Sequence, residues 1–229
     1  MIRKVFPALF FLLIVSACNP KLPSGLRKND LKKNVEMTTD HGIMIIQLSD
    51  STPLHRDNFL KLVKSKFYDS LLFHRIIKDF MIQGGDPDSK RAKAEDGNLG
   101  SGGVGYTIPA EFRSTLFHKR GAIAAARNDN PEKASSGCQF YVVQGRKFTD
   151  SSFAAIETTR LQHKIPEYQR NVYTTVGGTP WLDQGYTVFG EVIRGIEVVD
   201  SIAAEQTNAN NRPIKDIRII KVSLIKRER

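Results

Sequence analysis

Cysteine is scarce in this sequence, with only Cys18 and Cys138 among 229 residues. A small domain held together by several disulfides is therefore excluded. The chain also lacks repeats at the period of a solenoid, which excludes an elongated repeat array. A length of 229 residues, with 40% hydrophobic and 25% charged residues, instead predicts one sizeable globular domain.

The patterns that hold a metal or a cofactor are missing as well. The five histidines show no metal-ligand spacing. The glycine-rich stretch 100–105 follows no apolar strand and precedes Pro109, where a dinucleotide-binding fold needs a helix. Ser135, Ser136 and Cys138 have no elbow motif and no evident base. We therefore expect no metal, no cofactor and no covalent nucleophile.

The N-terminus has the three regions of a secretory signal. Two basic residues precede an apolar run over 5–15 that is too short to span a bilayer. The ending Val15-Ser16-Ala17-Cys18 resembles a bacterial lipobox, which implies a lipoprotein signal peptide over 1–17 and a lipid-modified Cys18 at the start of the mature chain. An ordinary cleaved signal with a chance cysteine is the alternative. A lipobox implies a domain in the cell envelope, outside the cytoplasm in the periplasm and anchored to a membrane, and leaves Cys138 unpaired and buried.

Basic and turn-forming residues crowd the next segment, 18–34. It carries Lys21, Arg27, Lys28, Lys32 and Lys33, together with Pro20, Pro23 and Gly25. We predict a flexible tether whose charges each add roughly 1 kcal/mol of attraction to an anionic membrane. A solvated linker whose charges do little is the alternative. We expect no nucleic-acid partner, because the basic residues are not interleaved with exposed aromatics and the expected compartment is outside the cytoplasm.

Beyond residue 35 the pattern favours a β-rich fold with many turns, given 17 glycines, 10 prolines and short β-branched runs. The stretch VEMTTDHGIMIIQL, 35–48, is predicted to be a hairpin that turns at 40–42. A helix is expected next, with Thr52 as its cap and Pro53 at its first position. Its apolar face comprises Phe59, Leu62, Val63 and Phe67.

The stretch FHRIIKDFMIQGGD, 73–86, places an arginine in an apolar strand. Alternation puts Arg75 across from Met81 or Gln83 on one sheet face. A guanidinium there is costly unless it reaches a cleft or finds acceptors. From the residues alone, Arg75 is either a rim arginine paired with a carboxylate or a carbonyl, or a working group.

This stretch resembles the most diagnostic segment of the cyclophilin family of peptidyl-prolyl cis/trans isomerases. Similar motifs follow in order: GSGGVGYTIPAEF at 100–112, HKRGAIAAAR at 118–127, SGCQFYVV at 136–143 and WLDQGYTVFGEV at 181–192. The resemblance spans Val35 to Lys226 and implies an isomerase domain over 35–229. The implied fold is mostly β, an eight-stranded antiparallel closed barrel capped by two helices, of which the second lies near 195–206.

The resemblance also implies a set of site residues. Arg75 matches the catalytic arginine. The family residues that form the proline pocket correspond to Phe80, Met81, Tyr141 and Leu182. The residues that hold the arginine and the peptide match Gln83 and Gln139. The two family residues whose backbone contacts the substrate correspond to Ala126 and Arg127. The aromatic residue at the edge of the groove corresponds to Trp181. Trp181 further implies affinity for cyclosporin.

Three positions depart from the family pattern. Arg127 replaces a polar amide but would contribute backbone contacts either way. Tyr141 stands where many members carry phenylalanine, so its hydroxyl must find a partner or reach solvent. Tyr186, counted among the substrate-binding residues, replaces a histidine that is common in eukaryotic members.

Residues 148–178 form a longer connection than in the shortest family members, and we predict a helical insertion. Asp150 is expected to cap a first helix bearing Phe153, Ile156 and Leu161. Pro166 is expected to open a second helix with an apolar stripe of Val172, Tyr173 and Val176. The insertion either shapes one end of the groove or is simply packed on the barrel.

The function implied is rotation of X-Pro bonds in exported, proline-containing polypeptides by a monomeric enzyme that assists folding in the envelope. A peptide-binding module without turnover and a scaffold for envelope partners are the alternatives. The enzyme is favoured by Arg75 together with Phe80, Met81 and Gln83, because a module that only binds could dispense with a donor for the twisted amide.

Overall fold

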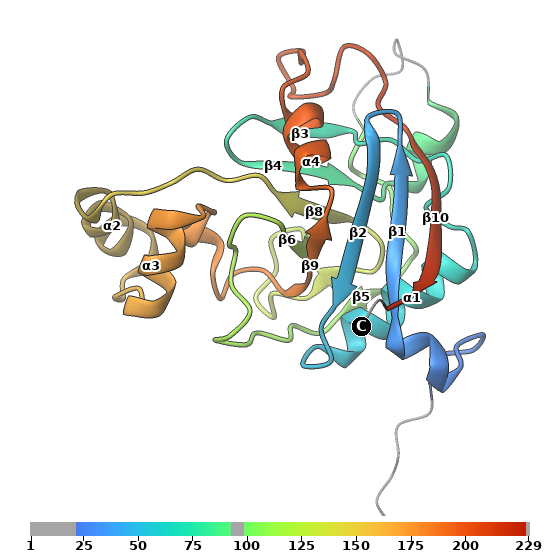
Figure 1. Cartoon of the computed structure of the whole chain (residues 1–229), viewed down its shortest axis with the longest axis horizontal. Helices are drawn as coiled ribbons and strands as arrows, with labels where there is room; N and C mark the ends of the chain where they lie inside the picture. The colour runs from blue at the N-terminus through green and yellow to red at the C-terminus, as the bar shows by residue number, and fades with distance from the viewer. Residues whose placement is uncertain (1–21, 93–98, 228–229) are drawn as a thin grey trace, which may run out of the picture.

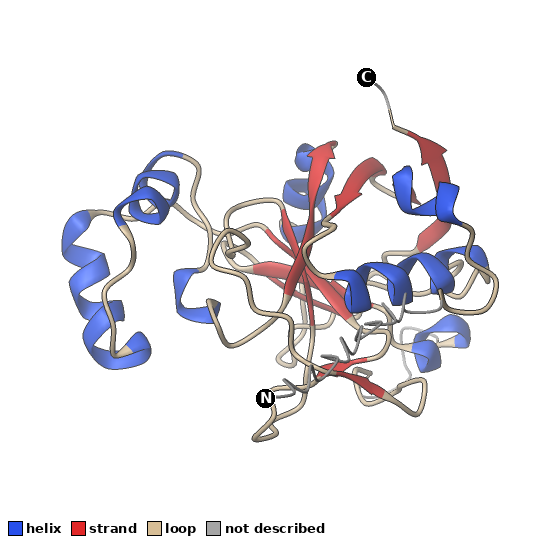
Figure 2. Ribbon diagram, turned by 90° about the horizontal axis from the view of Figure 1, so that it is seen from below, coloured by secondary structure: helices blue, strands red, loops and turns tan. Residues whose placement is uncertain are grey.

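The structure is a computed structural model that describes residues 22–92 and 99–227 (Figures 1 and 2). One antiparallel sheet contains eight strands in the order β10-β1-β2-β9-β6-β8-β4-β3. These strands are β1 (Lys33–Thr39), β2 (Gly42–Leu48), β3 (Arg75–Ile77), β4 (Met81–Gly84), β6 (Ala122–Ala125), β8 (Phe140–Val143), β9 (Val188–Arg194) and β10 (Ile219–Lys226). A separate pair joins β5 (Thr107–Ile108) to β7 (Ser135–Ser136). The mostly β, eight-stranded prediction is confirmed.

The sheet is curled rather than fully closed by strand pairing. Its edge strands β3 and β10 do not pair with each other. The edges meet instead between the segment before β3 and the start of β10, where the Phe73 amide donates to the Ile217 carbonyl at 2.9 Å and the Ile219 amide to the Leu71 carbonyl at 2.7 Å. Strand β3 has only 3 residues, and all of them pair with β4. This differs slightly from the predicted closed barrel.

Two helices cover the sheet, as predicted. Helix α1 (Pro53–Lys64) contacts β9 and β10, and α4 (Ile196–Ala203) contacts β2, β3 and β4. The apolar residues of both helices join the inward-facing strand residues in one core. Strand side chains alternate between two faces, so the other face of β4, β6, β8 and β9 carries a second apolar cluster, on the outer side of the curled sheet.

Helix α1 is capped by a residue distant in sequence. Thr52 occupies the N-cap position, but its side chain makes no capping hydrogen bond. The Glu111 carboxylate accepts instead from the backbone amides of Leu54 at 3.2 Å and His55 at 3.0 Å. The helix ends at Lys64, so Phe67 lies beyond it. Thr52 is thus the N-cap residue and Pro53 begins the helix, as predicted, and the apolar face is right, but the Thr52 side chain does not cap the helix and the helix ends earlier than expected.

The predicted tether over 18–34 is shorter than expected. A 3-10 helix, η1 (Lys28–Lys32), leads directly into β1 at Lys33. Asp30 is buried and pairs with Lys33 at 3.1 Å and Lys64 at 2.6 Å, and hydrogen bonding to Lys64 holds the pKa of Asp30 well below its usual value. Residues 28–34 thus belong to the folded domain. Cys18 and the signal segment 1–17 lie outside the described residues.

Cys138 is buried with a free thiol, which confirms its predicted burial. Within residues 22–92 and 99–227, no helix has both the length and the apolar character needed to cross a membrane.

The insertion forms two helices that project from the sheet, on the left in Figure 1. The first, α2 (Asp150–Ile156), continues as a π-helical turn, η3 (Glu157–Leu161), and the second is α3 (Glu167–Thr175). Thr149 rather than Asp150 is the N-cap of α2. Val176, predicted on the apolar stripe of the second helix, is 46% exposed. The buried apolar residues of the insertion are Phe148, Phe153, Ile165 and Tyr173.

The insertion is pinched at its base by two glycines. Arg146 and Gly178 pair through hydrogen bonds of 3.3 and 3.0 Å. A Cβ on Gly145, whose φ is +64°, would lie 2.5 Å from the Gly178 Cα. The backbones at Gly145 and Gly178 can approach so closely because neither residue has a Cβ.

Candidate active site

A cavity of about 190 Å³ opens on the outer face of the sheet. It is lined by Arg75, Phe80, Met81, Gln83, Ala126, Arg127, Tyr141, Leu182 and Tyr186. These are all the residues predicted for the site except Gln139 and Trp181. The structure therefore brings together side chains from four separate motifs of the sequence.

Strand register explains why the central groups share one face. Arg75 lies directly opposite Gln83 in the β3–β4 pair, and Gln83 lies opposite Tyr141 in the β4–β8 pair. Directly opposite residues in antiparallel strands point to the same side. The arginine, the glutamine and the pocket floor thus form one row across three strands.

A chain of hydrogen bonds orients the guanidinium of Arg75. Its Nη1 donates to Gln83 Oε1 at 3.3 Å, and Gln83 Nε2 donates to Gln139 Oε1 at 3.1 Å. Gln139 Nε2 in turn donates to the carbonyls of Gly100 at 2.9 Å and Gly102 at 2.8 Å. Gln139 therefore stands behind the cavity as a brace.

Arg75 has no carboxylate partner in the part of the chain that the structure describes, and its side chain donates to the amide oxygen of Gln83. No ion pair found within the described ranges includes it, and its nearest acceptors are Gln83 and, at 4.0 Å, the Met81 sulfur. Partial burial lowers the pKa of Arg75, yet a guanidinium stays charged at any relevant pH. Donors of this cation remain available to a ligand in the cavity.

The floor and walls of the cavity are apolar. Met81, Ala126 and Tyr141 are buried, and Phe80 and Leu182 pack beside them. Tyr186 meets Tyr141 edge-on with ring centroids 5.9 Å apart. A small apolar ring would find matching surface here, with the guanidinium at its rim.

The hydroxyl of Tyr141 finds a buried partner. It lies 2.9 Å from His118 Nε2, while His118 Nδ1 lies 2.8 Å from Asp183 Oδ1. Because a carboxylate only accepts, Nδ1 carries the proton and the Tyr141 hydroxyl donates to Nε2. Burial raises the pKa of Tyr141 well above its usual value, with Tyr186 and Asp183 adding to the effect. Sequence reasoning missed His118 and Asp183, although both lie inside motifs that it quoted.

Arg127 contributes its side chain to the rim. Its Nε donates to the Gly185 carbonyl at 2.9 Å, and its guanidinium lies 4.9 Å from the Tyr186 ring centre. Both backbone groups of Ala126 already bond within the protein, to Gln139 and Ser136. A substrate chain would therefore meet Arg127 or the second lone pair of the Ala126 carbonyl.

Trp181 lies beside the cavity rather than in it. It belongs to a 3-10 turn, η4 (Pro180–Leu182). Its ring lies 5.8 Å from that of Phe80 and 5.9 Å from that of Phe148. Trp181 thus joins the cavity wall to the insertion.

His74 occupies the buried face of β3's lead-in, next to Arg75. Burial lowers the pKa of His74 from 6.5 to about 4, despite the opposing charge of Asp86. Between those values the unfolded chain binds a proton that the folded chain does not, so stability falls as the pH drops.

We expect the free energy of unfolding to decrease by up to about 3 kcal/mol from this histidine alone between pH 6.5 and 4. Urea unfolding across that range measures it. A His74→Leu variant should show a shallower pH dependence, because its side chain does not titrate. Parallel curves for the two proteins would contradict the assignment.

A second buried cluster has the shape of a catalytic triad. Glu111 Oε2 lies 2.8 Å from His55 Nδ1, and His55 Nε2 lies 3.0 Å from Ser135 Oγ. The sequence prediction that Ser135 has no base is therefore wrong. Its hydroxyl is nevertheless enclosed, since Ser135 is 1% exposed and the cavity beside His55 measures only about 10 Å³. Burial opposes ionisation of Glu111, but hydrogen bonds from His55 and the helix amides outweigh it and lower its pKa. The cluster ties α1 to β7.

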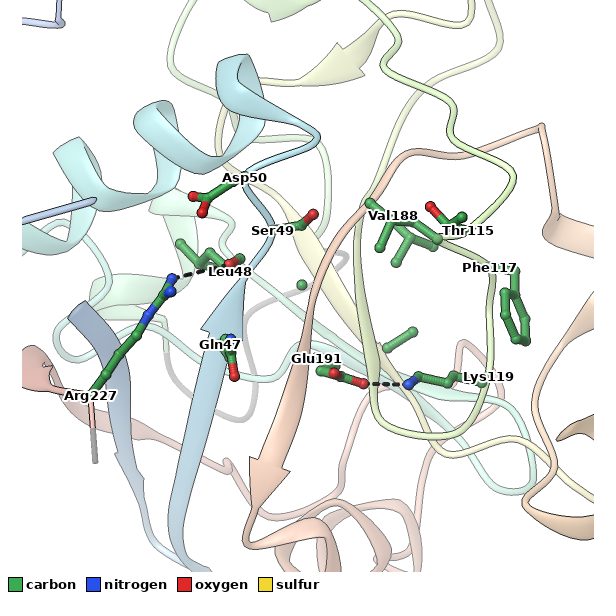
Figure 3. A pocket seen from close by; sticks show the side chains of 13 residues that line it. Gln47, Leu48, Ser49, Asp50, Thr115, Phe117, Lys119, Val188, Glu191 and Arg227 are labelled. Atoms are coloured by element: carbon green, nitrogen blue, oxygen red, sulfur yellow. Dashed lines mark hydrogen bonds and ion pairs between the residues drawn. The ribbon is translucent and has the colours of Figure 1, made fainter. Parts of the chain in front are cut away.

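Other cavities differ in character. One of about 310 Å³ lies between β2, β9 and the segment 115–119, where Lys119 and Glu191 form an ion pair at 2.5 Å (Figure 3). It contains no residue predicted for the site. Another of about 220 Å³ shares Gln83, Ala126 and Arg127 with the Arg75 cavity. The groove therefore continues past Arg75 toward the glycine-rich loop.

Comparison with solved structures defines the class of fold. The crystal structure of a cyclophilin type peptidyl-prolyl cis-trans isomerase from Cryptosporidium parvum matches with a TM-score of 0.60 at 22% identity. The match covers 85% of this chain and 99% of that one. The fold is therefore cyclophilin-like.

Sequence relatives agree with the fold. The family model for "Cyclophilin type peptidyl-prolyl cis-trans isomerase/CLD" matches residues 34–224. A Staphylococcus haemolyticus protein named "Putative peptidyl-prolyl cis-trans isomerase" is 35% identical over 201 residues, covering 87% of this chain and 94% of that protein. A Staphylococcus saprophyticus protein of the same name is 32% identical over 207 residues, covering 90% and 98%. The chain belongs to the cyclophilin-type peptidyl-prolyl cis-trans isomerase family and is an isomerase of X-Pro bonds.

Proposed function

We propose that the cavity around Arg75 binds the proline ring of a polypeptide and that Arg75 promotes rotation of the preceding bond. The observation that carries this is the guanidinium itself, which is braced by Gln83 at the rim of an apolar cavity and has no carboxylate partner among the described residues. The proposed substrates are exported, proline-containing proteins.

The chemistry needs a donor and no covalent step. Rotation about an X-Pro bond has a barrier of about 18–20 kcal/mol, because the nitrogen lone pair is delocalised into the carbonyl. In the twisted transition state the lone pair returns to the prolyl nitrogen. A donor aimed at that nitrogen stabilises the twisted form more than either planar form, which is the condition for catalysis. Arg75 supplies a permanent charge and a planar fork of donors.

The apolar surroundings strengthen this effect. Met81, Tyr141 and Leu182 would hold the pyrrolidine ring in place. They also exclude water, which would otherwise favour the more polar planar amide. Flanking residues of the substrate would extend into the adjoining cavity of about 220 Å³.

An isomerisation assay tests the proposal. The Cryptosporidium protein was crystallised in the presence of the dipeptide Ala-Pro, so an Ala-Pro bond is a reasonable probe. We expect catalytic amounts of the chain to speed cis/trans exchange in an Ala-Pro tetrapeptide, measured by NMR exchange. Binding without faster exchange would instead indicate a peptide-binding module. We further propose that cyclosporin competes through Trp181, and unchanged activity at micromolar cyclosporin would contradict this.

We also propose that the domain works in the bacterial envelope, held to a membrane by lipid on Cys18. The support is the arrangement of charged, apolar and small residues over 1–18. Several acyl chains would give stable anchoring where one would be marginal. Globomycin, which blocks lipoprotein signal cleavage, should cause the precursor to accumulate, and unchanged processing would contradict the proposal.

A further inference from the structure

The α2–α3 insertion reaches the Arg75 cavity by two separate routes. One is a chain of hydrogen bonds that ends at Tyr141, and the other is a chain of aromatic rings that ends at Phe80. Both end residues line the cavity.

The hydrogen-bonded route begins on α3. The hydroxyl of Tyr173 donates to Asp183 Oδ2 at 2.6 Å. The other carboxylate oxygen accepts from His118 Nδ1 at 2.8 Å, and His118 Nε2 accepts from the Tyr141 hydroxyl at 2.9 Å. Tyr173 is 0% exposed, His118 1% and Tyr141 5%. Buried, fully partnered polar chains fix the positions of their members.

The backbone around His118 is held from both sides. Its amide donates to Asp183 Oδ1 at 2.9 Å. Its carbonyl accepts from the Thr179 amide at 2.8 Å, immediately after the glycine at the base of the insertion. His118 therefore cannot move without moving either η4 or the insertion base.

The aromatic route runs alongside. Phe148 packs on Phe153 of α2 with centroids 5.8 Å apart and on Trp181 at 5.9 Å. Trp181 then meets Phe80 at 5.8 Å. The insertion thus contacts the groove edge through rings as well as through hydrogen bonds.

We propose that the insertion positions the pocket, with Tyr173, Asp183 and His118 acting as positioning residues that set the pocket floor through Tyr141. The inference rests on the proposed role of the Arg75 cavity. A floor that contacts the proline ring does so in both planar and twisted states. Loss of its position should therefore raise KM and leave kcat nearly unchanged.

Single hydroxyl deletions test this. We expect Tyr173→Phe and Tyr141→Phe each to raise KM for an Ala-Pro tetrapeptide about fivefold, the size of one lost hydrogen bond. The KM of the double variant should be no higher than that of the more strongly affected single variant, because both changes break the same chain of hydrogen bonds. Tyr168→Phe is the matched control. Tyr168 lies on the same helix as Tyr173, but its hydroxyl donates to the Ser114 carbonyl. The KM of this variant should therefore stay at the wild-type value.

A binding measurement separates this inference from the proposed catalytic role. Titrating the labelled chain with the same tetrapeptide gives Kd by NMR, and Trp181, the only tryptophan, supplies a single indole signal next to the pocket. Tyr173→Phe should raise Kd by the same factor and shift that indole signal. This result is expected whether or not the wild type or the variant shows turnover. A wild-type Kd and KM for Tyr173→Phe, even with a lower melting temperature, would overturn the proposal. The proposal would also be overturned if the KM increases of the two single variants multiplied in the double variant.

Discussion

Replacing Arg75 with alanine is expected to lower kcat/KM for Ala-Pro isomerisation by about a hundredfold to a thousandfold. The estimate follows from the loss of one transition-state donor, about 2.7–4 kcal/mol in comparable oxyanion sites. Arg75→Lys should restore little of this rate, because a lysine is a point charge without the planar fork that Gln83 orients. The NMR exchange assay measures both variants.

A lysine on the same hairpin provides the control for this prediction. Lys78 is exposed and lies in the turn between β3 and β4, so Lys78→Ala removes a nearby charge without touching the cavity. Its rate should match that of the wild type. Equal rates for Arg75→Ala and wild type would remove Arg75 from the mechanism, whereas a loss in Lys78→Ala would point to general electrostatics.

A single methyl group at Gly178 is expected to destabilise the protein by about 3 kcal/mol, or roughly 6–12 °C in Tm. A Cβ there would lie 2.2 Å from the His118 carbonyl oxygen and 2.6 Å from the Tyr173 ring. Neither neighbour can yield easily, since one is backbone and the other is fully buried. The φ of +155° adds to the strain.

Thermal unfolding of Gly178→Ala and Gly103→Ala gives the comparison. A Cβ on Gly103 would meet nothing within 4 Å, so that variant should unfold within about 2 °C of the wild type, as expected for a surface substitution. If Gly178→Ala also remains within that interval, the tight packing at the base of the insertion is not a significant source of stability.

Local patterns predicted the elements of this fold well. The hairpin of β1 and β2, the apolar face of α1 and the two helices of the insertion follow from periodicity and turn residues over short stretches. The placement of the cavity residues depended on the resemblance, because nothing in the separate motifs shows that Arg75, Tyr141 and Tyr186 meet on one sheet face.

Several failures involve partners distant in sequence, whereas the N-cap of α2 and the exposed Val176 are local errors. Thr52 has the right chemistry for a cap, but Glu111 replaces it from a loop far along the chain. Periodicity cannot show which residue will approach a helix end. The same applies to Tyr141, whose need for a partner was foreseen but whose partner, His118, was not. Likewise the basic residues of 28–34 suggested a tether, because Asp30 gave no sign that it would be buried between two lysines.

The pinched base at Gly145 and Gly178 also makes the insertion a modular unit. Because its two ends already touch, changing the length of the loop between them adds little to the entropy of closing it. Relatives could therefore lengthen, shorten or exchange this arm during evolution while the sheet and Arg75 stay in place. An engineered replacement of the arm would have to keep the hydrogen bond from Tyr173 to Asp183, because that bond lies on the route to the pocket floor.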